Sequence, residues 1–307
     1  MMTFKQMILA GILVYSSILA AAAENNGKTV AFAQDTMAND FRKAQAREVA
    51  DTLKKYPNIH FVSSDAKGKT ALLISQINNF IDTKADLLII GTNDAKTVVP
   101  VVAKAYKSGI PVIILDRGIQ GDDYTTFINS DNIKIGMLGA QYIAKQLNGK
   151  GKVLLFEGIQ TADVTHLRSK GFLDTIEKYK GIHVIKRTGN YLRKDAILEM
   201  EKLIASGEKI DAIFSESDSM LSGARLALEH HGINPASLIT VGCDYTSEAR
   251  DAIRKGTQSG SVLFPLGGVK SAEIAAKIFK GEKVPKHILI PVELITKENV
   301  EKVKPIF

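Results

Sequence analysis

Short apolar runs alternate with amphipathic stretches along the first half of the chain. The runs are rich in Val, Ile, Leu and Ala and predict the strands 29–33, 59–62, 86–90, 111–115 and 125–128. Between them, apolar residues at helical spacing predict the helices 41–53, 72–81 and 97–108. Continuous apolar strands separated by helices are typical of a parallel sheet that is covered on both faces.

The same alternation then repeats in the second half. The predicted strands are 152–156, 183–186, 212–214 and 239–241. The predicted helices are 133–147, 167–178, 196–205, 220–230 and 248–254. Two successive sets of alternating units indicate an α/β protein with two Rossmann-like lobes, each built on a parallel sheet. A closed (β/α)₈ barrel is the alternative, but the two similar halves fit it poorly.

The pattern changes after Ser261. A strand at 262–264 is followed directly by Pro265, a helix is expected at 269–279 and a last strand at 288–292. These late pieces must return to one lobe or the other, with crossovers near Asp131, Phe264 and Pro291. We therefore expect an N-terminal lobe of residues 28–130 plus 265–290 and a C-terminal lobe of residues 131–264 plus 291–307.

The N-terminus carries the pattern of an export signal. Lys5 precedes an apolar stretch from Met7 to Ala22, and small residues lead to Glu24. This predicts a cleaved secretory signal peptide at residues 1–23 and a periplasmic protein; an uncleaved anchor is the alternative. Cys243 is the single cysteine, so no intramolecular disulfide is possible, which fits a bacterial envelope.

Composition and motifs argue against several classes of function. The net charge of +7 is compatible with nucleic-acid binding, but no compact run of Lys and Arg occurs and an exported protein would not meet DNA. There is no G-x-G-x-x-G after the first strand, no phosphate-binding P-loop and no G-x-S-x-G elbow. We expect no nucleotide cofactor, and reversible binding rather than catalysis.

The histidines and the cysteine do not predict a metal site. No His pair has H-E-x-x-H spacing, and the adjacent His230 and His231 should point about 100° apart on a helix. We expect these two on the surface or at a helix end. His166 lies near a strand-to-helix loop and is a candidate for the cleft, whereas Cys243 is expected to be a small buried hydrophobe.

Polar side chains gather where the predicted strands end. In open parallel sheets, ligands bind outside the carboxyl ends of the strands. The candidates there are Gln34, Asp35, Asn93, Asp116, Arg117, Ser130, Tyr191, Ser217, Asp218 and Asp244. Hydroxyl groups both donate and accept hydrogen bonds, and carboxylates, amides and the guanidinium groups of Arg can bind them. This set of side chains therefore suits a polyhydroxylated ligand. For Asp35 and Asp218, a role as a helix N-cap is an equal alternative.

Several motifs, in their order and spacing, identify a family resemblance. They are VAFAQDTMANDFRKA, PVIILDR, INSDN, RSKGF, SESDSMLSGA, VGCDYT and KIFKGEKVP. Over nearly the whole chain, the sequence resembles the ribose- and galactofuranose-type periplasmic sugar-binding proteins of bacterial ABC transporters. These share their core with the LacI-type repressors, but here the predicted signal peptide stands in place of a DNA-binding helix-turn-helix. The resemblance implies two lobes, three hinge crossovers and closure around one sugar.

The resemblance also implies ligand contacts by position. They are an aromatic at Phe41, the adjacent Arg42, the Asp116-Arg117 pair, Ser130 at a hinge, Arg168, Tyr191, Ser217 and Asp244. Four positions depart from the family pattern: Gly91 and Ser217 replace amides, Cys243 replaces an aromatic, and Phe264 falls close to a hinge amide. These losses argue against ribose and favour another pentose or a furanose.

The expected partners follow from the same resemblance. We expect a monomer that captures a monosaccharide and delivers it to the membrane permease of an ABC transporter. Presentation of the ligand to a membrane histidine kinase or chemoreceptor is the alternative, and an enzyme that uses the same cleft is a third. We expect no metal ion and no nucleic-acid partner.

Overall fold

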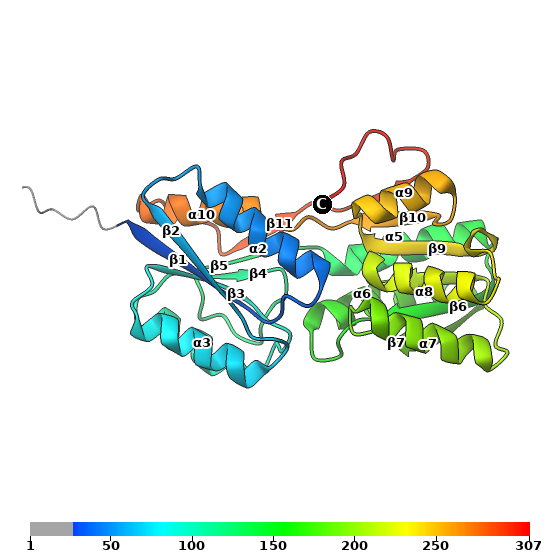
Figure 1. The fold of residues 1–307 in the computed structure, drawn as a ribbon, viewed down its shortest axis with the longest axis horizontal. Coiled ribbons are helices and arrows are strands. Elements are labelled where there is room, and N and C mark those ends of the chain that lie inside the picture. The colour runs from blue at the N-terminus through cyan, green and yellow to red at the C-terminus, as the bar shows by residue number, and fades with distance from the viewer. Residues whose placement is uncertain (1–26) are drawn as a thin grey trace, which may run out of the picture.

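Two six-stranded sheets, each covered by helices on both faces, form two lobes that lie side by side (Figure 1). The computed structural model describes residues 27–307, so the signal peptide predicted at residues 1–23 lies outside the described residues. The predicted α/β fold with two parallel-sheet lobes is confirmed. Among the described residues, no helix is both long and apolar enough to cross a membrane.

The N-terminal lobe contains a fully parallel sheet in the order β11-β5-β4-β3-β1-β2. Its strands are β1 (Lys28–Gln34), β2 (Ile59–Asp65), β3 (Leu87–Gly91), β4 (Val112–Leu115), β5 (Thr126–Ser130) and β11 (His287–Ile290). Its helices are α2 (Asp40–Leu53), α3 (Thr70–Asp82), α4 (Val99–Lys107) and α10 (Gly268–Phe279). All five residues of β3 are buried because helices cover both faces of the sheet.

The C-terminal lobe contains a sheet in the order β12-β10-β9-β8-β6-β7, parallel except for β12. Its strands are β6 (Lys150–Glu157), β7 (Gly181–Thr188), β8 (Ala212–Ser215), β9 (Ile239–Asp244), β10 (Gly260–Leu263) and β12 (Glu293–Thr296). Its helices are α5 (Asn132–Gln146), α6 (Asp163–Ile176), α7 (Arg193–Ala205), α8 (Asp218–His230) and α9 (Ser247–Lys255), with a 3₁₀ turn η1 (Pro235–Ser237).

Two element boundaries differ clearly from the prediction. The strand expected at 288–292 ends at Ile290, because Pro291 has no N–H to donate to a strand ladder. A separate strand, β12, follows and pairs antiparallel with β10 at the edge of the other sheet. Helix α6 begins at Asp163, four residues before the predicted start at 167.

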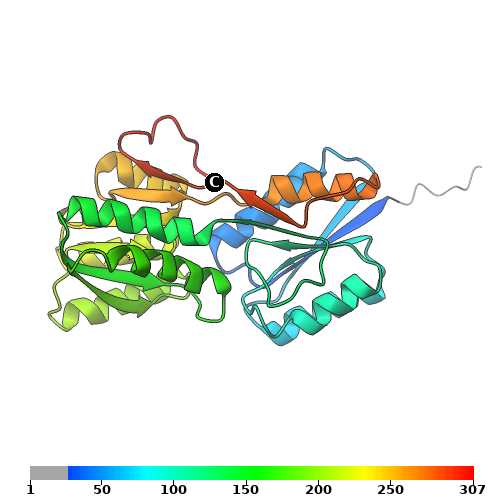
Figure 2. The same ribbon diagram turned by 180° about the vertical axis from the view of Figure 1, so that it is seen from behind.

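The chain passes between the two sheets three times, after β5, after β10 and after β11. Figures 1 and 2 show the C-terminal segment over the junction of the lobes. The backbone N–H of Ser247 donates to the carbonyl oxygen of the last residue, Phe307, at 2.8 Å. The chain end is therefore tied to the start of α9.

Candidate functional site

A small cavity lies between the lobes, where the carboxyl ends of strands from both sheets face each other. Its wall consists of Asn39, Phe41, Arg42, Asp116, Arg117, Val164, Arg168, Tyr191, Ser217, Asp244 and Phe264. The free space is about 20 Å³, which is enough for about one water molecule. A sugar would therefore need the lobes to part or the lining side chains to move.

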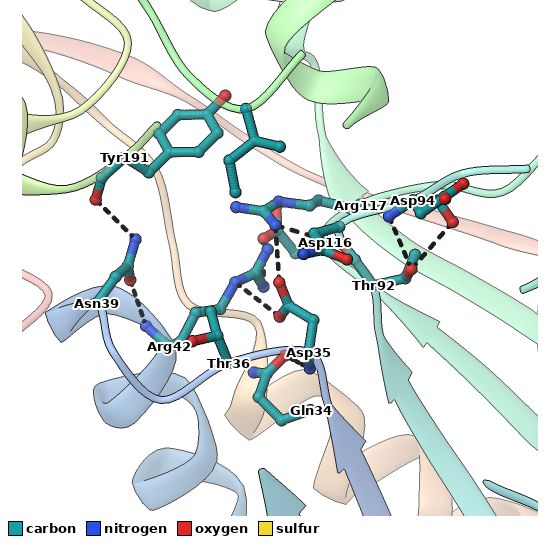
Figure 3. Close-up of polar contacts among 12 residues, drawn as sticks. Gln34, Asp35, Thr36, Asn39, Arg42, Thr92, Asp94, Asp116, Arg117 and Tyr191 are labelled. Carbon is teal, nitrogen blue, oxygen red and sulfur yellow. Dashed lines mark hydrogen bonds and ion pairs between the residues drawn. The ribbon is translucent and has the colours of Figure 1, made fainter. Parts of the chain in front are cut away.

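A cluster of ion pairs from the N-terminal lobe forms one side of the cavity (Figure 3). Arg42 Nη1 lies 2.6 Å from Asp116 Oδ2, and Arg117 Nη1 lies 3.0 Å from Asp35 Oδ2. The pKa of Arg117 is lowered, first by its burial and then by the neighbouring charge of Arg42. Asp35 is within ion-pair distance of both guanidinium groups, since its Oδ1 lies 3.7 Å from Arg42 Nε, and its negative charge partly offsets their repulsion.

Several polar atoms of this cluster are buried and have no hydrogen-bond partner among the described residues. They are Asp35 Oδ1, Arg42 Nε, Asp116 Oδ1 and Arg117 Nε. Buried polar atoms without partners are rare, and each one costs free energy. The cluster therefore retains donors and acceptors for further hydrogen bonds.

Arg168 and Asp244 form the opposite side, from the C-terminal lobe. Arg168 Nε donates to Asn132 Oδ1 at 2.8 Å, and its Nη1 donates to the carbonyl oxygen of Glu216 at 2.6 Å. These two bonds fix the plane of the guanidinium group at the start of α5 and the end of β8. Burial raises the pKa of Asp244 well above its usual range, and the nearby Asp218 carboxylate raises it further.

Aromatic rings complete the wall. Phe41 and Phe264 stack with centroids 5.3 Å apart, and the Arg168 guanidinium lies 4.6 Å from the centroid of Phe264. The Arg117 guanidinium lies 5.1 Å from the centroid of Tyr191, so this contact joins the two lobes. Such rings provide apolar faces next to the charged groups.

The backbone is unusual at the strand ends that carry these residues. Asp116 has φ +71° and Asp244 has φ +112°, in the left-handed region that residues with a Cβ rarely adopt. Asn190, Tyr191 and Tyr245 also have positive φ. Backbone strain of this kind costs about 1–3 kcal/mol per residue and clusters at functional sites.

The other predicted site residues do not line this cavity. Gln34, Asp35 and Ser130 are buried behind the wall. Asp218 is fully buried, where it accepts hydrogen bonds from Gln258, Ser261 and the backbone of Tyr245. His166 lines a second, larger pocket between the lobes, and Asn93 accepts a hydrogen bond from Thr161 through its carbonyl oxygen.

Comparison with known proteins places this architecture in a family. A family model described as a periplasmic binding protein domain matches residues 30–283. The chain belongs to this family. The ribose import binding protein of Haemophilus influenzae is 31% identical over 294 residues, covering 94% of this chain and 96% of that protein.

Two solved structures of periplasmic binding proteins extend the comparison. A solute-binding protein of an ABC transporter from Bacillus halodurans, with bound myo-inositol, superposes with a TM-score of 0.86 at 29% identity, covering 92% of this chain and 98% of that one. The fructose-binding periplasmic domain of a hybrid two-component system superposes with a TM-score of 0.85 at 27% identity, covering 90% and 92%. The relatives are solute-binding proteins rather than enzymes.

One departure from the pattern of periplasmic sugar-binding proteins has a direct structural explanation. A Cβ atom added at Gly91 would lie 2.2 Å from Gln34 Oε1. The amide of Gln34 therefore occupies the space beside Gly91, where Gln34 Nε2 donates to Gln45 Oε1 at 3.1 Å. The space that a side chain at Gly91 of β3 would need is thus filled by a side chain from β1.

Sequence reasoning missed two residues of the wall and one that supports it. Asn39 caps α2 by accepting from the backbone N–H of Arg42 at 2.9 Å, and it donates to the carbonyl oxygen of Tyr191 across the cleft at 3.3 Å. Asn39 lies two residues before the predicted helix 41–53 and Asn132 lies directly before the predicted helix 133–147, so a capping signal could have drawn attention to both. Val164 carried no such signal, because its position depends on how the lobes meet.

Proposed function

We propose that this periplasmic binding protein captures a monosaccharide or a related cyclic polyol reversibly and presents it to an ABC importer. The observation that supports this proposal is the cavity wall itself. It combines the guanidinium groups of Arg42, Arg117 and Arg168 with the carboxylates of Asp116 and Asp244. Sugar hydroxyl groups bind such donors and acceptors through charge-assisted hydrogen bonds.

We also propose which parts of the chain move as rigid bodies when a ligand binds. Residues 28–130 with 265–290 would move as one body, and residues 131–264 with 291–307 as the other. A ligand that contacts both bodies favours the closed form by its differential affinity for that form. The three crossings of the chain would act as the hinge.

The proposed roles of the site residues follow from their positions. Arg42, Asp116 and Arg117 would hold ring hydroxyl groups from the N-terminal lobe, and Arg168 and Asp244 would do so from the C-terminal lobe. Phe41, Tyr191 and Phe264 would cover the apolar face of the ring, and Ser217 would add a hydroxyl.

The test is a ligand panel against the mature chain after unfolding and refolding to remove bound solute. D-Ribose, D-fructose, myo-inositol and xylitol are assayed by thermal shift and by isothermal titration calorimetry, with product analysis for turnover. At least one should raise Tm, bind in the micromolar range or tighter and remain unchanged. Arg117→Ala should weaken that ligand at least about 100-fold, because it removes a charged donor and leaves Asp35 without its closest partner.

The matched control is Arg187→Ala, in a partly exposed arginine of β7. It should leave the affinity unchanged, and circular dichroism with Tm should show that both ligand-free variants are folded at the assay temperature. Absence of stabilisation by every sugar and polyol would overturn the ligand class. Unchanged affinity in Arg117→Ala would remove Arg117 from the site.

A sensory role is the second candidate, favoured by the similarity to the fructose-binding domain of a hybrid two-component system. A membrane sensor, instead of a permease, would then recognise the closed, ligand-bound form of the protein. The import and sensory roles can be separated by measuring the uptake of labelled ligand by cells with and without the protein. Loss of uptake in the cells that lack the protein supports the import role.

A further inference from the structure

Three metal-ligating side chains converge on the surface of the C-terminal lobe, outside the cavity wall. Glu201 lies in α7, His230 is the last residue of α8, and His231 caps that helix. One ligand atom from each residue lies within 4.8 Å of the other two. Within residues 27–307, no other group of three such side chains comes as close.

The end of α8 explains why the two histidines meet, although their spacing predicts that they diverge. His231 follows the last helical residue and has φ −91° and ψ +13°, so its side chain leaves the helical direction. The imidazole centroids of His230 and His231 lie 5.2 Å apart, with the rings at 72°. Both rings face the carboxylate of Glu201.

Glu201 divides its two oxygens between the two rings. Oε1 lies 3.2 Å from His230 Nδ1, and Oε2 is in hydrogen-bond contact with His231 Nε2. Hydrogen bonds from His231 and then His230 lower the pKa of Glu201. In the described part of the chain, Glu201 makes no ion pair with a Lys or an Arg. Within the described residues, the two imidazoles are therefore the only basic groups at ion-pair distance from the Glu201 carboxylate.

We propose that Glu201, His230 and His231 form a binding site for a divalent transition-metal ion, of which Zn²⁺ is the probe. Two imidazoles and one carboxylate are a donor set that Zn²⁺ uses in proteins, at about 2.0–2.2 Å from each ligand atom. The side chains of His230 and His231 are 77% and 37% exposed, so their rings can turn by the small amount that coordination requires. Water completes the coordination from the solvent side.

The ion would connect α7 to the end of α8. These helices pack side by side, since a Cβ atom at Gly223 of α8 would lie 2.5 Å from the carbonyl oxygen of Arg193 in α7. A shared ion therefore ties together two helices that are already rigidly packed. Because none of its ligands lines the sugar cavity, the metal site and the sugar site should bind independently.

An ordinary ion pair between Glu201 and protonated histidines is the competing explanation, and pH separates the two. Metal binding requires neutral imidazoles, whereas the ion pair requires protonated ones. Zinc affinity should therefore fall at least about tenfold from pH 7.5 to pH 5.5, because protons compete with the metal ion for the imidazole nitrogens.

The experiment titrates ZnCl₂ into the EDTA-treated, dialysed mature chain, using isothermal titration calorimetry and native mass spectrometry. We expect one zinc ion per chain. Glu201→Gln and His231→Ala should each weaken zinc binding at least about tenfold, while His183→Ala, at an exposed histidine of β7, should bind zinc as the wild type does. Sugar affinity should be the same in all four proteins.

Two results would overturn the proposal. One is zinc binding of equal affinity in the wild type, Glu201→Gln and His231→Ala, which would place the ion elsewhere. The other is no stoichiometric binding below about 1 mM zinc, which would leave the cluster as an ion pair. Sugar binding is measured first for every protein. A result that overturns the zinc proposal is therefore distinguishable from one that overturns the proposed sugar ligand.

Discussion

At the residue scale, a buried pair of carboxyl groups lies directly behind Tyr191. Ser169 Oγ is 2.7 Å from Glu157 Oε1 and 2.9 Å from Glu216 Oε1. A hydroxyl group has one hydrogen and can donate to only one of these oxygens. The second contact is satisfied when Glu216 carries a proton and donates to Ser169.

Other contacts of Glu216 agree with a protonated carboxyl group at neutral pH. Burial raises its pKa from 4.5 to about 8, against the lowering effect of the Gly158 backbone N–H. Its Oε2 accepts from that N–H at 2.8 Å and lies 3.3 Å from Tyr191 Oη. The protonation of Glu216 therefore affects a side chain of the cavity wall.

The first prediction concerns the pH dependence of stability. Between pH 5 and pH 8 the folded chain holds a proton on Glu216 that the unfolded chain has lost, so the free energy of unfolding should fall as pH rises. For a shift from 4.5 to about 8, this amounts to up to about 5 kcal/mol. In Glu216→Gln the amide can replace the protonated carboxyl group in both contacts, and this part of the pH dependence should disappear.

The measurement is urea unfolding at pH 7 and pH 9, a range above the raised pKa of about 6 for Asp218. The wild type should lose more stability over this range than Glu216→Gln. Glu208→Gln, at an exposed carboxylate, is the control and should follow the wild type. Parallel curves for wild type and Glu216→Gln would show that Glu216 is already ionised at neutral pH.

At the element scale, the contact between α5 and α6 positions Arg168. A Cβ atom at Gly136 of α5 would lie 2.0 Å from the carbonyl oxygen of Arg168, and one at Gly171 of α6 would lie 2.0 Å from that of Ile133. The two helices therefore cross with their backbones in contact. This close approach lets Asn132, at the start of α5, reach Arg168 Nε.

The second prediction is that Gly171→Ala separates these helices. The added methyl group must displace the backbone of α5, which should lower stability by about 2 kcal/mol despite the better helix propensity of Ala. Ligand affinity should fall as well, because Arg168 moves away from Asn132. Lys170→Ala, on the exposed side of α6, should change neither Tm nor affinity. A Gly171→Ala variant with wild-type Tm and affinity would contradict the proposed role of the crossing.

Most elements could be predicted from apolar periodicity, and the exceptions have physical reasons. β12 escaped prediction because four residues at a sheet edge, beginning two residues after Pro291, show no clear period. Strand ends and family motifs pointed to most of the wall, including Asp116, Arg168 and Asp244. The meeting of His231 with Glu201 could not be predicted, because it depends on the geometry of a helix end.

At the scale of the whole molecule, hydrogen bonds across the cleft hold the lobes together. The backbone N–H of Gly118 donates to Asp163 Oδ2 at 2.9 Å, and Thr161 Oγ1 donates to the carbonyl oxygen of Asn93 at 2.6 Å. Asp163 is the first residue of α6, and burial raises its pKa. Gly118 directly follows Arg117, so these contacts adjoin the cavity.

The third prediction is that Asp163→Ala favours the open form. The variant loses a half-buried carboxylate contact that joins the two lobes, which should shift the equilibrium toward open lobes by about 10-fold to 100-fold. Small-angle scattering should show a larger radius of gyration without ligand, and ligand should dissociate faster. Asp174→Ala, at an exposed site of the same helix, should behave as the wild type. Identical scattering for Asp163→Ala and wild type would mean that other contacts control closure.

Cys243 makes such closure measurements practical. It is the single cysteine of a chain without tryptophan, it is fully buried in the core of the C-terminal lobe, and burial raises its thiol pKa. Thiol-reactive dyes should therefore leave the folded wild type unlabelled. A pair of cysteines introduced on the surface, one in each lobe, would carry dyes without background, and energy transfer between them would report opening and closing in solution.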